Sequence, residues 1–153
     1  MLRELQTNDL KTTDAMYKAD VAMATGMAVV KNRTDKTADI PSEKTVDGFF
    51  FVNKERVPTG LNTAKEDMSD YDDDFCKIKK DEFVKLIIPQ VGERYATDQC
   101  TVTGLTQGVS LMITDGKFVK ADKASKLIYD GPYNDAGHTL AIVEIVSDAV
   151  TNA

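Results

Sequence analysis

A run of acidic side chains is the part of this sequence whose residue types and spacing most resemble a chemical site. Six carboxylates fall within nine residues, with no basic residue among them: Glu66, Asp67, Asp70, Asp72, Asp73 and Asp74. Oxygen-rich clusters of this kind bind calcium. Asp70, Asp72 and Asp74 also repeat the alternating acids that open an EF-hand loop.

The rest of the EF-hand pattern is missing. That loop requires glycine at its sixth position and a bidentate glutamate at its twelfth, where this chain has Phe75 and Asp81. We therefore reject an EF-hand. The preferred interpretation is a solvated, extended connection, in which the carboxylates of 66–74 repel one another. The lysines within 77–80 offset part of this negative charge. A contact with a basic partner surface is the second interpretation, and an irregular calcium site is the third.

Histidine and cysteine, the residues that most nucleophilic and metal-assisted mechanisms use, are scarce. His138 is the single histidine and would have to be the base of any Ser or Cys mechanism. Cys76 and Cys100 lie outside any Gly-flanked elbow and are too far apart for a CxxC motif. One histidine and two scattered cysteines also fall short of a zinc site. We expect free thiols in a reducing cytoplasm, no catalytic, cofactor-binding or metal-ligating residues, and no enzymatic activity.

Phosphate-binding loops and sugar-processing sites are poorly supported as well. Neither GxxxxGK[ST] nor GxGxxG occurs, and "TGLTQG" has no basic residue and no helical pattern after it. Any two carboxylates can meet in a folded chain, so a carboxylate pair for glycoside chemistry stays open. The chain has no Trp to form the usual sugar platform. A small β-barrel enzyme or ligand-binding module remains the alternative to a non-enzymatic protein.

Length and charge narrow the range of partners. The chain has 153 residues, 42% of them hydrophobic and 29% charged, which is typical of one folded domain. The formal net charge is -6, and removing the six acids of 66–74 leaves 19 acids against 19 bases. No Lys/Arg stripe marks a phosphate-binding face. No apolar run approaches the roughly 20 residues of a membrane span. We expect neither nucleic acid nor membrane as a partner.

The elements that must position these residues are predicted to be strands. Residues 1–25 have weak periodicity and are expected to form an N-terminal arm, or a helix that begins after Asp9. Residues 26–153 are expected to form a β-rich domain, with strands in "MAVVKN", "GFFFVNKER" and "DEFVKLIIP". In the last of these, the two-residue period places Val84, Leu86 and Ile88 on the inward face.

The strongest local signal is the hairpin "SLMITDGKFVKA". Asp115-Gly116 is a dipeptide typical of a type I′ turn, whose two central residues need positive φ. A short strand, a turn at 130–132, a loop and a final strand over 139–146 are expected to follow, and that final strand is apolar on both faces, which predicts a central position. The predicted fold is mainly β with minor helix: a single compact domain, barrel- or sandwich-like and tulip-type.

Residues 92–146 resemble the auxiliary capsid proteins of tailed bacteriophages, called head decoration or cement proteins. In that family a G-x-x-L stretch leads into a D-G-K-x-V-x-A hairpin, and a closing strand of the form G-x-x-x-x-V-x-V follows. The segment that resembles this family, residues 92–146, covers about a third of the chain. The residues that match the pattern are Gly104, Gly108, Leu111, Asp115, Gly116, Lys117, Val119, Ala121, Gly137 and Val143.

The resemblance implies a viral structural protein of the virion that binds the outside of a bacteriophage capsid. Its partner would be the major capsid protein, with a homo-oligomer possible, and its location the capsid surface after synthesis in the bacterial cytoplasm. An arm formed by residues 1–25 would suit part of that contact. The "GFFFV" strand and the acidic connection depart from the pattern and leave open a tail, tube or fibre component. A lipoyl-type carrier is disfavoured because Lys117 lacks the Met-Lys-Met context.

Overall fold

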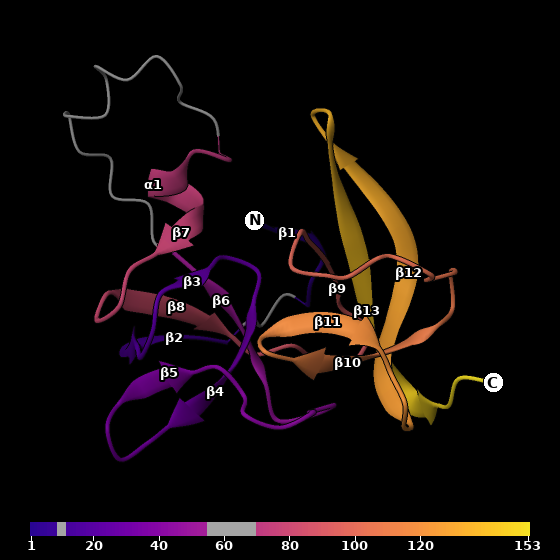
Figure 1. The fold of residues 1–153 in the computed structure, drawn as a ribbon, viewed down its shortest axis with the longest axis horizontal. Helices are drawn as coiled ribbons and strands as arrows, with labels where there is room; N and C mark the ends of the chain where they lie inside the picture. Colours follow the sequence, from indigo (N-terminus) through magenta and orange to yellow (C-terminus); the bar gives the residue numbers. More distant parts are fainter. Residues whose placement is uncertain (9–11, 55–69) are drawn as a thin grey trace.

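The protein is built almost entirely from strands, which form a closed barrel and a six-stranded sheet beside it (Figure 1). The computed structural model describes residues 1–8, 12–54 and 70–153. The prediction of a mainly β single domain is confirmed. Within the described residues, no helix is long and apolar enough to cross a membrane.

The barrel has the strand order β2-β5-β4-β6-β8. Its strands are β2 (Thr13–Ala19), β4 (Ala28–Asn32), β5 (Thr37–Asp39), β6 (Phe50–Asn53) and β8 (Phe83–Ile87). Alternation places Tyr17 and Ala19 inside together with Val84 and Leu86, as predicted for β8. Ile87 is buried too, because it faces the core shared with the second sheet. The strands predicted in "MAVVKN" and "GFFFVNKER" are confirmed as β4 and β6.

The second sheet is antiparallel throughout, in the order β1-β9-β13-β12-β10-β11. Its strands are β1 (Leu2–Gln6), β9 (Arg94–Thr97), β10 (Ser110–Thr114), β11 (Lys117–Lys120), β12 (Ser125–Asp135) and β13 (His138–Val150). The central position predicted for the final strand is confirmed, because β13 pairs with β9 on one side and β12 on the other. Two short strands, β3 (Met23–Ala24) and β7 (Lys77–Ile78), form a separate pair.

The predicted Asp115-Gly116 hairpin is confirmed as the turn between β10 and β11. Thr114 pairs with Lys117, and the two turn residues have φ values of 52° and 74°. The turn also contacts the barrel, because the backbone N–H of Ala28 donates to the Gly116 carbonyl at 2.8 Å. The hairpin therefore joins the two sheets as well as reversing the chain.

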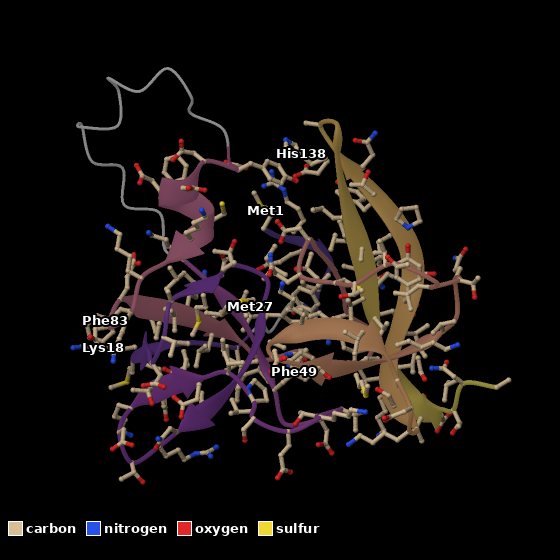
Figure 2. The ribbon with its side chains drawn as sticks, in the orientation of Figure 1. Met1, Lys18, Met27, Phe49, Phe83 and His138 are labelled. Carbon is tan, nitrogen blue, oxygen red and sulfur yellow. The ribbon has the colours of Figure 1, made fainter. Side chains whose placement is uncertain are left out.

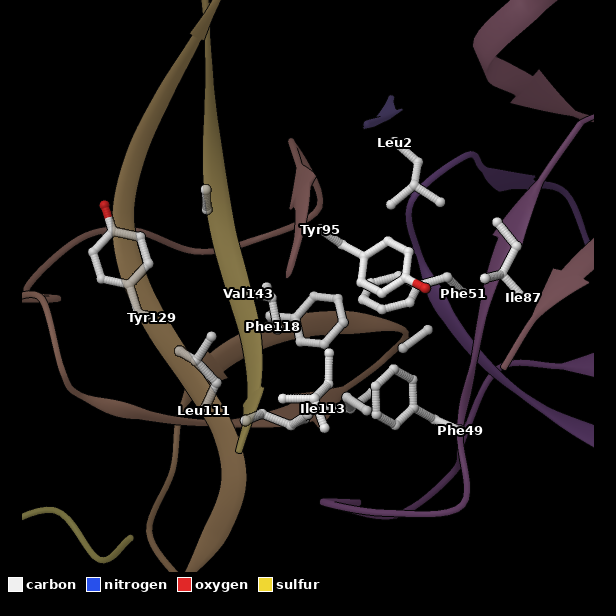
Figure 3. Packing of buried hydrophobic residues seen from close by; sticks show 14 residues of the cluster. Leu2, Phe49, Phe51, Ile87, Tyr95, Leu111, Ile113, Phe118, Tyr129 and Val143 are labelled. Carbon is white, nitrogen blue, oxygen red and sulfur yellow. The ribbon is translucent and has the colours of Figure 1, made fainter. Parts of the chain in front are cut away.

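An aromatic cluster fills the space between the barrel and the sheet (Figure 3). The ring of Phe51, from β6, lies 4.5 Å from that of Tyr95 and 5.4 Å from that of Phe118, centroid to centroid. Phe49 packs edge-on against Phe118 at 5.9 Å. Because both sheets contribute to one buried cluster, they form a single domain, and "GFFFV" belongs to its core.

The prediction for residues 1–25 is wrong where the structure describes them. The expected helix after Asp9 is replaced by β2, in which buried Tyr17 and Ala19 alternate with exposed neighbours at a two-residue period. The segment is not a separate arm either, because β1 is an edge strand of the large sheet and Leu2, 7% exposed, joins the aromatic core.

The turn predicted at 130–132 is also wrong. Strand β12 continues through these residues, and its register with β13 shifts between Tyr129 and Pro132. Gly131 has a φ of 96°, which suits a bulge. Proline is tolerated because β10 pairs with β12 only near Leu127 and Ile128, so Pro132 needs no donor on that side.

Candidate functional site

The candidate site is a polar cleft beside the tip of the β12–β13 hairpin, which we call the hairpin cleft. It has a volume of about 250 Å³ and brings together three segments that are distant in the sequence. Figure 2 shows His138 at the tip of the two long strands. The lining residues are Arg3, Asp70, Tyr71, Asp135, Ala136 and His138.

A tight turn sets the positions of Asp135 and His138. The two residues are cross-strand partners at the end of the β12–β13 ladder. Between them, Ala136 and Gly137 have φ values of 51° and 93°, as a type I′ turn requires. The Asn134 side-chain oxygen accepts a hydrogen bond from the Gly137 N–H at 2.8 Å and fixes the turn. The carboxylate and the imidazole are therefore held on neighbouring strands.

A short helix places the acidic segment against this hairpin. Helix α1 (Asp73–Cys76) is capped by Asp72, whose side chain accepts a hydrogen bond from the Asp74 N–H at 2.9 Å. Asp73 forms an ion pair with Lys77 one turn later, at 2.8 Å. Tyr71 precedes the cap and extends to the hairpin. The predicted extended connection is thus wrong for residues 70–75, which form a capped turn.

Asp135 is the centre of the polar contacts. Its Oδ2 accepts hydrogen bonds from the Tyr71 hydroxyl at 2.7 Å and from Arg3 Nε at 2.8 Å. The Arg3 guanidinium also forms an ion pair with Asp70 at 2.7 Å. One arginine therefore links strand β1, the segment before α1 and the hairpin tip.

These contacts keep the cleft charged. The hydrogen bond from Tyr71, together with that from Arg3, lowers the pKa of Asp135 below its ordinary value of 3.8. The hydrogen bond with Asp135 raises the pKa of the Arg3 guanidinium. Partial burial and the same carboxylate raise the pKa of Tyr71, so its hydroxyl remains a neutral donor at physiological pH. The cluster contains one guanidinium and two carboxylates.

His138 lies against this cluster without entering its hydrogen bonds. Its ring stacks on Tyr71 with centroids 3.6 Å apart and an interplanar angle of 13°. No Ser, Thr or Cys is among the described residues that line the cleft. The arrangement can cross-link three segments and can hold a small polar ligand beside the imidazole. Of the predicted residues, the cleft unites His138 and Asp70.

The other described residues of the acidic run do not line the cleft. Glu66 and Asp67 fall outside the described residues, and Asp72, Asp73 and Asp74 serve the cap, the first turn and the ion pair of α1. Within residues 1–8, 12–54 and 70–153, no group of three or more His, Cys, Asp or Glu side chains is arranged to hold a metal ion.

The two cysteines are free, as predicted, and both are half-buried. Burial raises the pKa of the Cys76 thiol, and it raises that of Cys100 to about 11. A thiol with a raised pKa is a poor nucleophile at neutral pH. Cys76 lies at the end of α1, where its Sγ is 3.3 Å from the Tyr71 carbonyl oxygen, and Cys100 packs against the aromatic core.

The comparisons with known proteins are negative throughout. No family model, no curated protein and no solved structure matches this chain.

Arg3, Tyr71 and Asp135 were not identified from the sequence. No motif links them, because they belong to segments separated by most of the chain. The one available signal is the Asp135–His138 turn, whose Ala-Gly centre resembles the two-residue hairpin loops with positive φ. A hairpin predicted there would have placed Asp135 opposite His138.

Proposed function

We propose that this chain is a non-enzymatic structural protein of a tailed bacteriophage that binds the outer surface of the capsid and reinforces it. The observation that carries the proposal concerns the D-G-K-x-V-x-A pattern, which resembles that of the capsid decoration proteins. In this chain the pattern coincides with one β-hairpin, β10–β11. Asp115 and Gly116 form the turn of the β10–β11 hairpin, and the Ala121 N–H closes its end on the Ser110 carbonyl at 2.9 Å.

Two further matched residues support the same proposal through the core. Leu111 and Val143 are fully buried in the cluster shared by both sheets. A rigid β-framework of this kind suits a protein whose affinity comes from modest contacts repeated over a lattice, because multivalency raises occupancy without a strong single site. The partner under this proposal is the major capsid protein.

Co-sedimentation with capsids tests the proposal. Purified protein is mixed with bare capsids of the phage that encodes it, and the pelleted fraction is measured against protein concentration. Saturable binding, together with capsids that resist heat or low salt better than bare ones, is the expected result. A protein that stays in the supernatant at all concentrations would contradict capsid decoration, and the same assay with purified tails would then test a tail component.

A second candidate, a small ligand-binding or enzymatic module, has one observation in its favour. The hairpin cleft brings the only histidine together with two carboxylates, Asp70 and Asp135. NMR of the His138 ring during titration with inorganic phosphate, acetate and glucose tests it. A saturable shift that Asp135→Asn abolishes would support a binding site. An unchanged His138 signal at millimolar concentrations of all three probes would count against it.

A further inference from the structure

One outer face of the barrel carries the two most exposed large hydrophobic side chains among the described residues. Met16 is 75% exposed and Phe83 is 59% exposed. The other exposed hydrophobic side chains are all valines: Val21, Val91, Val102 and Val150. Met16 and Phe83 lie on β2 and β8, which pair directly with each other. The concentration of exposed apolar area on one strand pair is typical of a binding surface.

The strand period explains why these side chains face solvent. On β2, Tyr17 and Ala19 point into the barrel, so Met16 and Lys18 point outward. On β8, Val84 and Leu86 point inward, so Phe83 and Lys85 point outward. Lys18 and Phe83 are direct cross-strand partners. We call the surface formed by Met16, Lys18, Phe83 and Lys85 the barrel face.

The charges on the barrel face are positive. The Lys18 ammonium lies 5.0 Å from the centroid of the Phe83 ring, and Figure 2 shows the two side chains together at the outer edge of the barrel. Within the described part of the chain, neither Lys18 nor Lys85 forms an ion pair with a carboxylate. Asp14, further along β2, is already paired with Lys31 at 2.7 Å.

The carboxylates near this surface lie at its end. Asp20 follows β2, Asp81 and Glu82 directly precede β8, and the Glu82 carboxylate is paired with the Lys54 ammonium at 2.8 Å. The barrel face itself carries a ring, a thioether and two ammonium groups. The chain as a whole is acidic, with a net charge of -6, so this positive face is a local exception.

We propose that the barrel face is the surface through which the protein docks on its partner, and that the partner presents carboxylates beside an apolar side chain. The apolar group would cover Phe83 and Met16, while the carboxylates would pair with Lys18 and Lys85. Charge complementarity would speed and orient the encounter, and burial of Phe83 would supply the anchor. This inference rests on the proposed function only in naming the capsid as the partner.

The test compares two variants matched in chemistry. Lys18→Glu with Phe83→Ser removes one aromatic ring and reverses one charge on the barrel face. Lys120→Glu with Val102→Ser reverses one charge on β11 and removes one exposed apolar side chain from the loop between β9 and β10, both outside the barrel face. Circular dichroism and thermal unfolding confirm that both variants fold. Capsid binding is measured by co-sedimentation at low salt and at about 0.3 M salt, where exposed charge pairs are screened.

We expect the barrel-face variant to bind capsids at least about tenfold more weakly than wild type. The control variant keeps wild-type affinity, and wild-type binding weakens at the higher salt. If wild type binds and the barrel-face variant binds equally well, the barrel face is not the docking surface, while the proposed function stands. Sedimentation equilibrium detects a further outcome: a wild-type dimer that the variant abolishes would make this face a contact between copies and would overturn the acidic partner.

A second probe separates the inference from the proposed function. If wild type does not bind capsids, the decoration proposal fails, and a synthetic peptide of alternating Glu and Leu is titrated while backbone NMR signals are recorded. Shifts confined to β2 and β8, lost in the barrel-face variant and kept in the control, would support the docking surface for another acidic partner. Shifts spread over the whole protein, or no shifts at all, would overturn it.

Discussion

Replacing Gly116 with alanine tests how closely the β10–β11 turn packs against the barrel. Gly116 has a φ of +74°, and a Cβ there would lie 2.6 Å from Met27 Cε and 3.3 Å from the Ala28 carbonyl oxygen. Gly104 is a matched control, because its φ is +76° and nothing lies within 4 Å of a Cβ placed on it. Both variants place alanine in the left-handed region, and only one meets the barrel.

The expected costs follow from these contacts. The left-handed conformation costs an alanine about 1–2 kcal/mol, so Gly104→Ala should lower the free energy of unfolding by that amount. Overpacking adds about 1–3 kcal/mol at Gly116. The Met27 methyl group can rotate away, but the Ala28 carbonyl belongs to β4 and accommodates the new methyl group only if the strand shifts. We therefore expect Gly116→Ala to lower the free energy of unfolding by about 2–5 kcal/mol in total.

Urea unfolding followed by far-UV circular dichroism and by tyrosine fluorescence measures both variants. For a domain of this size, each kcal/mol corresponds to a fall of about 2–4 °C in Tm. A difference of less than about 0.5 kcal/mol between the free energies of unfolding of the two variants is within the usual error of such comparisons. That result would mean that the hairpin turn does not pack closely on the barrel. The description of the hairpin as a link between the two sheets would then be wrong.

Three further predictions concern the hairpin cleft and the thiols. Tyr71→Phe removes the hydrogen bond to Asp135 and should lower the free energy of unfolding by about 1 kcal/mol; an unchanged urea midpoint would contradict this. Because the pKa of Asp135 is lowered on folding, its contribution to stability is present above the ordinary value of 3.8 and is lost as pH falls below it. Asp135→Asn should therefore be less stable than wild type at pH 7, with the difference shrinking in acid, as thermal unfolding across pH would measure. Burial raises the pKa of the Cys100 thiol to about 11. In a Cys76→Ser variant, Cys100 should therefore react with iodoacetamide at pH 8 much more slowly in the folded protein than in urea. Equal rates in the two conditions would refute the burial of Cys100.

Local signals explain the part of the fold that the sequence predicts well. The Asp115-Gly116 dipeptide specifies its own turn through the φ values it tolerates, and the alternation in β8 specifies which residues enter the barrel. The final strand was placed centrally because both of its faces are apolar, and burial on both sides requires such faces. Each of these signals is contained within a few residues.

The misplaced parts depend on partners far along the chain. Residues 1–25 have a weak pattern of their own, and Leu2–Gln6 and Thr13–Ala19 become strands because β9 accepts β1 and β8 accepts β2. The hairpin cleft is harder still to foresee, since Arg3, Tyr71 and Asp135 are far apart in the sequence and meet only in the folded chain. Neither the charge nor the spacing of the acidic run indicates that Asp72 caps a helix or that Tyr71 reaches the hairpin.

The pairing of β1 with β9 has a consequence for synthesis on the ribosome. Leu2 pairs with Thr97, so the first strand emerges long before its partner exists. The barrel has the same dependence, because β2 must wait for β8 to close it. A nascent chain therefore carries β2 without β8 until residue 87 has left the exit tunnel, and β1 without β9 until residue 97 has left it. Unpaired strand edges of this kind are prone to edge-to-edge aggregation. Products truncated before β9 should therefore accumulate as insoluble protein.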